Sequence, residues 1–332
     1  MKTRPLGSTA LQVSQICLGT MMFGDRTELA EAAEIVAHAR DHGVNFIDTA
    51  DVYGKGASET MVGTLIAPHR DHWLLATKIG NRMNSDEECG YARHWMLAEC
   101  EASLKRLATD RIDLYYLHRD YLGLDLEEPL RAIETLIKDG KIRHWGLSNF
   151  RAFRIAEAVH MARAMGIPAP VACQPYYNLL NRAPEVEVLP ACAHYGLGVV
   201  PYSPVARGVL TAKYRPGEKP SGESRGARVD KRFMETEFRA ESLIVAQQVK
   251  AHCEQTGRSP VHFACAWVLR HRAVSSVIAG PRTFAQWREY VDAPECAFSD
   301  GDEAFVNQRV APGHPSTPGY SDPLYPWESL RD

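Results

Sequence analysis

Four side chains that can exchange or steer protons lie near the ends of consecutive apolar runs. Asp48 ends the strand-like run that begins at Asn45, and Tyr53 lies five residues later in a loop. Lys78 and His118 each come directly after a further apolar run. A phenol, a carboxylate, an ammonium group and an imidazole are the groups that general acid–base chemistry uses.

Each of the four residues also has an ordinary structural interpretation. Asp48 can cap the turn after it, Tyr53 can pack, Lys78 can be a solvated loop residue, and His118 can be a hydrogen-bonded structural histidine. Taken together they follow three successive predicted strands at the same end. Active sites of α/β barrels are built where strands end, so the combination favours one catalytic group.

The elements that must position these residues alternate along the chain. Eight short apolar runs predict strands: Ile16–Gly19, Asn45–Asp48, Leu74–Thr77, Leu114–Leu117, Arg143–Leu147, Ala172–Gln174, Gly198–Pro201 and Ser275–Ile278. Amphipathic stretches between them predict helices, among them Glu28–His42, Ala92–Leu107, Pro129–Asp139 and Phe153–Met165. This alternation indicates parallel βα units. A doubly wound sheet would carry G-x-G-x-x-G after its first strand. Because residues 20–24 read TMMFG, the prediction is a (β/α)₈ TIM barrel.

The ends of the chain and one internal stretch fall outside this pattern. The segment RPLGSTALQVSQ predicts an N-terminal β-hairpin across one end of the barrel. Lys213–Arg232 is the longest irregular stretch, and repeated prolines predict an irregular tail over residues 311–332. No internal repeat or clean linker divides the chain, so residues 1–332 are expected to form a single barrel domain.

Composition excludes several classes of function. A net charge of −3 and a pI near 6.5 argue against a nucleic-acid partner. No run approaches eighteen apolar residues, so no membrane span is expected, and the N-terminus does not resemble a signal peptide. The eight cysteines form no C-x-x-C pair, which fits the reducing cytoplasm. His69 and His72 have no third ligand nearby, so no metal site is predicted. The glycines of 80–90 lack the Lys-Ser/Thr of a phosphate-binding loop.

The sequence resembles the aldo-keto reductase superfamily from about Arg4 to the tail. The matching pieces, in order, are GVNFIDTADVYG, LLATKIG, SLKRLATDRIDLYYLH, GLSNF, QPYYNLL, VVPYSPVARGVLTAKY and IAGPRTFAQWRE. The resemblance implies a barrel without a separate dinucleotide-binding domain and an NAD(P)H cofactor across the barrel mouth. It also implies reduction of an aldehyde or ketone, or the reverse oxidation.

The residue types then suggest roles in carbonyl reduction. Tyr53 would donate a proton to the carbonyl oxygen, and Lys78 would lower the pKa of Tyr53 by stabilising its phenolate. Asp48 would hold Lys78, and His118 would orient the carbonyl. The hydride would come from the cofactor.

Cofactor contacts are carried over from the resemblance. Ser148, Asn149 and Gln174 would hold the nicotinamide carboxamide, and Tyr202 would stack on its ring. The loop after the seventh strand would approach the pyrophosphate through Ser203, Val205 and Arg207, followed by Gly208.

After the eighth strand, Gly280 and Arg282 precede a predicted helix that begins near Thr283 and carries Gln286 and Glu289. A 2′-phosphate held by Arg282 at this helix terminus would favour NADPH over NADH. Related proteins often have Asn after the Glu of this motif. Tyr290 stands there, which puts an adenine contact at this position in doubt.

Substrate contacts and partners are less specified by sequence. Candidate pocket walls are Phe23, Trp95, Arg119, Asp120, Tyr176 and Tyr177, and the tail aromatics Tyr320, Tyr325 and Trp327 can cover the mouth or a subunit contact. The partner is a small-molecule carbonyl that the sequence does not name, and a homo-oligomer is left open. The alternative function is a nucleotide-binding regulatory subunit or redox-sensing partner protein. A barrel isomerase or hydrolase would need paired carboxylates or a metal at the strand ends, and neither is found.

Overall fold

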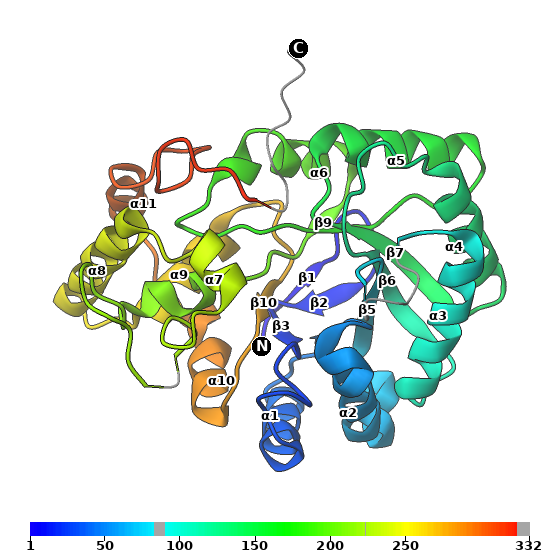
Figure 1. Cartoon of the computed structure of the whole chain (residues 1–332), viewed down its shortest axis with the longest axis horizontal. Helices are drawn as coiled ribbons and strands as arrows, with labels where there is room; N and C mark the ends of the chain where they lie inside the picture. Colours follow the sequence, from blue (N-terminus) through cyan, green and yellow to red (C-terminus); the bar gives the residue numbers. More distant parts are fainter. Residues whose placement is uncertain (83–89, 223, 324–332) are drawn as a thin grey trace.

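A parallel barrel forms the centre of the molecule in the computed structural model, which describes residues 1–82, 90–222 and 224–323 (Figure 1). Its strands are β3 Ile16–Gly19, β4 Phe46–Asp48, β5 Leu74–Ile79, β6 Ile112–Leu117, β7 Ile142–Ser148, β8 Ala172–Gln174, β9 Gly198–Val199 and β10 Val277–Ala279. They pair in the order β10-β3-β4-β5-β6-β7-β8-β9. A parallel bridge between Val199 and Val274 joins the two edges. The predicted (β/α)₈ barrel is confirmed.

Helices surround the strands on the outside (Figure 1). They are α1 Leu29–Asp41, α2 Ala57–Ile66, α3 Arg93–Arg106, α4 Glu127–Lys138, α5 Ala152–Ala164, α6 Val188–Tyr195, α7 Lys231–Thr236, α8 Ala240–Gln255, α9 Pro260–Arg270, α10 Phe284–Val291 and α11 Asp300–Asn307. Short 3₁₀ segments are η1 Tyr53–Gly56, η2 Ala67–His72, η3 Ala183–Glu185, η4 Ala206–Thr211 and η5 Ala293–Glu295. The four helices predicted by name correspond to α1, α3, α4 and α5.

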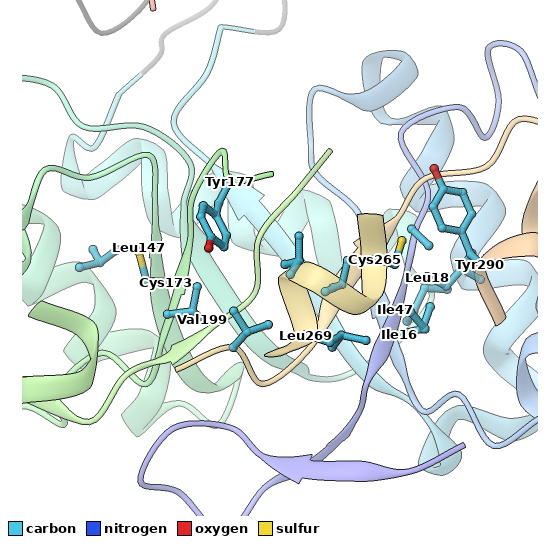
Figure 2. Packing of buried hydrophobic residues seen from close by; sticks show 14 of the residues in the cluster. Ile16, Leu18, Ile47, Leu147, Cys173, Tyr177, Val199, Cys265, Leu269 and Tyr290 are labelled. Atoms are coloured by element: carbon cyan, nitrogen blue, oxygen red, sulfur yellow. The ribbon is translucent and has the colours of Figure 1, made fainter. Parts of the chain in front are cut away.

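Alternation along each strand separates two hydrophobic layers, because successive side chains of a strand point to opposite faces. The barrel interior is filled by a cluster that includes Phe46, Ala76, Leu114, Tyr116 and Ala172. The residues between them point outward and pack under the helices, as Figure 2 shows for Ile47, Leu147, Cys173 and Val199. Consequently the residue two positions after each interior residue also points inward.

The N-terminal hairpin closes the amino-terminal end of the barrel, as predicted. Strands β1 Thr3–Pro5 and β2 Gln12–Ser14 pair antiparallel, and Leu6 and Val13 join the interior cluster. Gly7 has a φ of 59°, and a Cβ atom there would lie 2.3 Å from the Gly196 carbonyl oxygen. The hairpin therefore packs backbone against backbone on the segment that leads into β9.

The two irregular segments lie against the rest of the fold. The 213–232 stretch is largely turns, as predicted, and α7 begins at its end. In the tail, Ser316 N donates to the Leu180 carbonyl, and Asp322 pairs with both terminal nitrogens of Arg232. Over the described residues, no helix is both long enough and apolar enough to cross a bilayer.

The contact at Gly7 gives a test of the hairpin's contribution to stability. Gly7→Ala should lower the free energy of unfolding by about 3 kcal/mol, because both the backbone strain and the clash oppose the new methyl group. Gly257 has a similar φ of 63° with no atom within 4 Å of a built Cβ. The matched Gly257→Ala should cost only about 1 kcal/mol in urea unfolding. Equal losses would show that the hairpin contact adds nothing beyond strain.

Candidate active site

A pocket of about 520 Å³ opens at the carboxyl ends of the barrel strands. Asp48, Tyr53 and His118 line it, while Lys78 is fully buried behind them. The three strand residues follow the interior alternation, since Asp48 comes two positions after Phe46, Lys78 after Ala76, and His118 after Tyr116. The structure therefore brings together the four side chains that the sequence singled out.

The Lys78 ammonium has three protons and three acceptors. Its Nζ lies 2.5 Å from Asp48 Oδ1, 2.6 Å from the Thr49 carbonyl oxygen and 3.2 Å from Tyr53 Oη. The second Asp48 oxygen accepts a hydrogen bond of 2.8 Å from Gln174 Nε2. Asp48 and Lys78 are thus fixed from opposite sides, and Lys78 presents its remaining proton to the phenol.

The charges of this group depend on one another. Burial lowers the pKa of the Lys78 ammonium, but the Asp48 carboxylate and the Tyr53 oxygen outweigh burial and leave that pKa above its ordinary value. Lys78 is therefore a permanent cation. Burial raises the pKa of Tyr53, and Lys78 offsets only part of the rise. The expected lowering of the Tyr53 pKa by Lys78 is present, but burial is the larger effect and leaves that pKa above its ordinary value.

His118 is held in its neutral form. Burial and the nearby Lys78 charge lower its pKa well below 6.5. Its ring lies edge-on to Tyr53, with centroids 6.0 Å apart, and its backbone N–H donates to the Ile79 carbonyl. A neutral imidazole on the pocket wall can hydrogen-bond to an uncharged oxygen without adding charge to the site.

The loop that carries Tyr53 is shaped by left-handed backbone. Gly54, Lys55 and Gly56 have φ values of 55°, 55° and 87°, and α2 then starts at Ala57. Glu59, fully buried in the first turn of α2, accepts hydrogen bonds from Thr77 on β5 and from Arg106 of α3. The Tyr53 loop is thereby anchored next to the strand that carries Lys78.

Residues predicted to hold the nicotinamide meet at the ends of β7, β8 and β9. Asn149 Nδ2 donates to the His118 carbonyl and to Ser148 Oγ, each at 3.1 Å, and its Oδ1 accepts from Tyr202 Oη at 2.8 Å. All of them, together with Gln174, line the pocket. Gln174 also supports Asp48, a role that the sequence did not predict.

The loop after β9 forms a left-handed turn on the pocket wall. Ser203, Ala206, Arg207 and Gly208 have φ values of 58°, 49°, 49° and 95°. Ser203, Val205, Arg207 and Gly208 line the pocket. Two backbone N–H groups of this turn, those of Ala206 and Gly208, donate to the Ser203 and Val205 carbonyls within the loop. The turn therefore fixes the local backbone and places Arg207 on the pocket wall.

The segment after β10 reaches the same pocket from the other side. Gly280, Arg282, Gln286 and Glu289 line it, and Thr283 caps α10 by accepting from Gln286 N. Gln286 Oε1 accepts from Arg282 N at 2.8 Å. Tyr290 also lines the pocket although it is nearly buried in the core (Figure 2).

Sequence reasoning missed four cations that line the pocket: Lys213, Arg225, Arg228 and Arg232. Burial, then Arg225 and Arg282, lower the pKa of Lys213, and burial, then Arg207, lower that of Arg225. These positive groups repel one another, so an anion placed among them would be strongly attracted. The density of basic residues between 213 and 232 was the available signal, but it resembles a solvated loop.

The predicted substrate walls at Phe23 and Trp95 are wrong. Phe23 is fully buried in the core, and Trp95 packs from α3 against the same core. Neither lines the pocket.

Arg119 and Asp120 do not line the pocket either. Asp120 is buried and pairs with Arg154 at 3.1 Å, while Arg119 lies over the ring of Tyr121. A short acidic side chain next to His118 reaches a partner on the neighbouring helix rather than the mouth.

Tyr176 and Tyr177 also point away from the pocket. Tyr176 stacks on Tyr202 and donates to Glu237, and Tyr177 lies among the labelled core side chains of Figure 2 and donates to Glu185. Their hydroxyls donate to glutamates outside the site, the buried Glu237 and the partly exposed Glu185.

Of the three tail aromatics, Tyr320 lies in the part of the chain that the structure describes. Tyr320 lies under the guanidinium of Arg239, 3.7 Å from it, and does not line the pocket. Tyr325 and Trp327 fall outside the described residues. Within residues 1–82, 90–222 and 224–323, no cluster of three His, Cys, Asp or Glu side chains could hold a metal ion.

Comparison with known proteins identifies the family. Residues 15–308 match the aldo/keto reductase family. The chain belongs to that family. Like other aldo/keto reductases it is an NAD(P)H-dependent oxidoreductase.

Its relatives fall under two kinds of name. It is 33% identical to "Uncharacterized oxidoreductase YrpG" of Bacillus subtilis, over 97% of this chain and 98% of that protein. It is also 33% identical to a probable voltage-gated potassium channel subunit beta of Arabidopsis thaliana, over 88% of this chain and 91% of the relative. A putative subunit of the same type from Schizosaccharomyces pombe is 34% identical over 88% of both chains.

The neutrality of His118 has a measurable consequence for stability. The unfolded chain takes up a proton on this histidine near pH 6.5, whereas the folded protein does not. The free energy of unfolding should therefore fall as pH drops below about 6.5, by up to about 1.4 kcal/mol per pH unit from this residue. His118→Gln should remove that part of the slope in urea unfolding between pH 7.5 and 5. The exposed His69→Gln is the control, and an unchanged slope in His118→Gln would contradict the assignment.

Proposed function

We propose that the protein is an NADPH-dependent reductase of small-molecule aldehydes or ketones, acting reversibly, with Tyr53 as the proton donor. The observation that carries the proposal is the Lys78 contact. One buried ammonium joins Asp48 to the hydroxyl of Tyr53, and that phenol faces a pocket shared with a neutral His118.

The side chains would divide the reaction as follows. Tyr53 Oη donates its proton to the carbonyl oxygen as negative charge develops there, and Lys78 stabilises the phenolate that remains. Asp48 keeps Lys78 charged and in place. His118 donates a hydrogen bond to the same oxygen and fixes the carbonyl relative to Tyr53. The nicotinamide, when bound, supplies the hydride to the carbonyl carbon.

The pocket residues fit a dinucleotide phosphate. Asn149, Ser148, Gln174 and Tyr202 offer amide, hydroxyl and aromatic groups beside Tyr53, which suits a nicotinamide carboxamide and ring. The crowded cations Lys213, Arg225 and Arg282 suit phosphates, because an anion would relieve their mutual repulsion. Arg207, carried by the left-handed turn at 206–208, adds a further positive charge on the same wall. Arg282 at the start of α10 would take the 2′-phosphate and thereby favour NADPH.

A second candidate function comes from the channel-subunit relatives. The names of the Arabidopsis and Schizosaccharomyces proteins suggest that this chain can be a regulatory subunit that holds the nucleotide. The two functions are separated by NADPH consumption against a panel of aldehydes and ketones. NADPH binding without turnover on any of them would favour the regulatory function.

Tyr53→Phe tests the proton donor. Reduction should fall by about a hundredfold or more, since a positioned acid contributes at least that much. NADPH affinity, measured by fluorescence, should stay nearly unchanged because only a hydroxyl is lost. Tyr195→Phe, which changes a tyrosine outside the pocket, should keep full activity. Normal turnover in Tyr53→Phe would refute the role of Tyr53.

Arg282→Ala tests the cofactor preference. Loss of a charge-assisted contact to the 2′-phosphate should weaken NADPH by about tenfold or more. NADH lacks this phosphate and should be affected far less. Arg288→Ala, an exposed change on the same helix, is the control for α10. Equal weakening of both nucleotides would show that Arg282 does not meet the 2′-phosphate.

A further inference from the structure

A buried carboxylate lies behind the part of the pocket wall that Arg207 forms. Glu237 follows the last turn of α7, and its side chain is completely inaccessible to solvent. It does not line the pocket. Burying a carboxylate is costly unless it is paired, so its partners identify what it does.

Glu237 contacts two residues that lead to the pocket. Its Oε2 accepts a hydrogen bond of 2.6 Å from Tyr176 Oη. Its Oε1 lies 3.6 Å from Arg207 Nε, and within the described part of the chain neither of these two atoms has a hydrogen-bond partner. The link to Arg207 is therefore purely ionic, while the link to Tyr176 is a short hydrogen bond.

The Tyr176 side leads to the predicted nicotinamide platform. The Tyr176 ring stacks on the Tyr202 ring, with centroids 5.7 Å apart and planes tilted by 26°. Tyr202 in turn donates to Asn149. Because Glu237 holds the Tyr176 hydroxyl, the Tyr176 ring is held in place. That ring in turn supports the position of the Tyr202 ring in the pocket.

The Arg207 side leads to the left-handed turn. Ala206 and Arg207 both have a φ of 49°, a conformation that costs a non-glycine residue about 1 kcal/mol or more. Such strain persists only where surrounding contacts fix it. The buried charge of Glu237 lies directly behind this turn and is positioned to fix it.

Other charges around Glu237 have partners of their own. Arg232 pairs with Asp322, and Arg239 donates to Thr317 and to the Thr236 carbonyl. Burial raises the pKa of Glu237, and Arg207, the Tyr176 hydroxyl, Arg239 and Arg232 offset only part of that rise. Of these three arginines, Arg207 is the one that faces the Glu237 carboxylate and also lies in the left-handed turn.

We infer that Glu237 is a positioning residue with two separable effects on the proposed reaction. Through Arg207 it holds the turn and the cation that bind the cofactor phosphates, and through Tyr176 it holds the ring platform for the nicotinamide. This inference rests on the proposed function and adds to it a residue that touches neither cofactor nor substrate.

The chain contains a matched control for this arrangement. Tyr177, Glu185 and Arg182 form a second tyrosine–glutamate–arginine triad, with contacts of 2.8 Å and 2.9 Å, and none of the three lines the pocket. Glu185→Gln removes a glutamate charge from a triad of the same residue types away from the site, although there the arginine is hydrogen-bonded to the glutamate.

The test compares full-length wild type, Glu237→Gln, Tyr176→Phe and Glu185→Gln. The dissociation constant of NADPH is measured by fluorescence and kcat with a reducible aldehyde at saturating NADPH. Glu237→Gln keeps an acceptor for Tyr176 but loses the charge, so it should weaken NADPH by about fivefold or more. Tyr176→Phe should keep the dissociation constant within about twofold and lower kcat severalfold, since it frees only the platform. Glu185→Gln should change neither quantity by more than about twofold.

Several outcomes would overturn the inference. Unchanged or tighter NADPH binding by folded Glu237→Gln would refute the effect through Arg207. An equal loss of NADPH affinity in Glu185→Gln would refute it as well. An unchanged kcat in Tyr176→Phe would refute the claim that Glu237 positions the Tyr202 ring through Tyr176. Circular dichroism establishes folding, and if Glu237→Gln does not fold, the Tyr176→Phe result decides.

Wild-type measurements separate this inference from the proposed function. Wild type that binds NADPH but turns over no carbonyl refutes the reductase proposal, while the binding comparison between Glu237→Gln and Glu185→Gln still tests the Arg207 effect.

Discussion

A fully buried ammonium group is the feature on which the rest of the site depends. Lys78 is removed from water inside the barrel, and such a charge is tolerated only when its protons are satisfied and an opposite charge is near. Asp48, the Thr49 carbonyl and Tyr53 supply these partners, and Gln174 secures the far side of Asp48. The barrel must therefore hold the ends of β4, β5 and β8 and the loop that carries Tyr53 in register, because an error in any of them leaves a buried charge unpaired.

The charge of Lys78 lies at one end of the pocket, and a group of basic residues lies at the other end. Near Lys78, burial lowers the pKa of His118 and raises that of Tyr53, so the imidazole is neutral and the phenol keeps its proton at neutral pH. At the other end Arg225 and Arg282 lower the pKa of Lys213, while Arg225 also pairs with Asp230 and Arg232 with Asp322. The two ends thus match the proposed division between proton transfer and cofactor binding.

The wall between these ends is supported from behind rather than from within the pocket. Glu237 lies outside the pocket, yet it contacts the tyrosine that stacks on Tyr202 and faces the arginine of the left-handed turn. The hairpin plays a comparable part at the opposite end of the barrel, where Leu6 and Val13 complete the interior cluster. The pocket wall and the barrel interior are thus each completed by residues that are distant in sequence.

The sequence by itself determined the parts that follow from local periodicity. Apolar runs are a property of neighbouring residues, so the runs that end at Asp48 and Gln174, and those directly followed by Lys78 and His118, already placed these side chains at the same end of the barrel strands. Only the tertiary structure decided the direction of residues in loops. Tyr176 and Tyr177 turned to glutamates outside the pocket, Asp120 turned to Arg154, and four basic residues of 213–232 came to the pocket. It also decided the direction of the pKa of Tyr53, because the balance between a nearby cation and burial depends on how completely the folded chain excludes water.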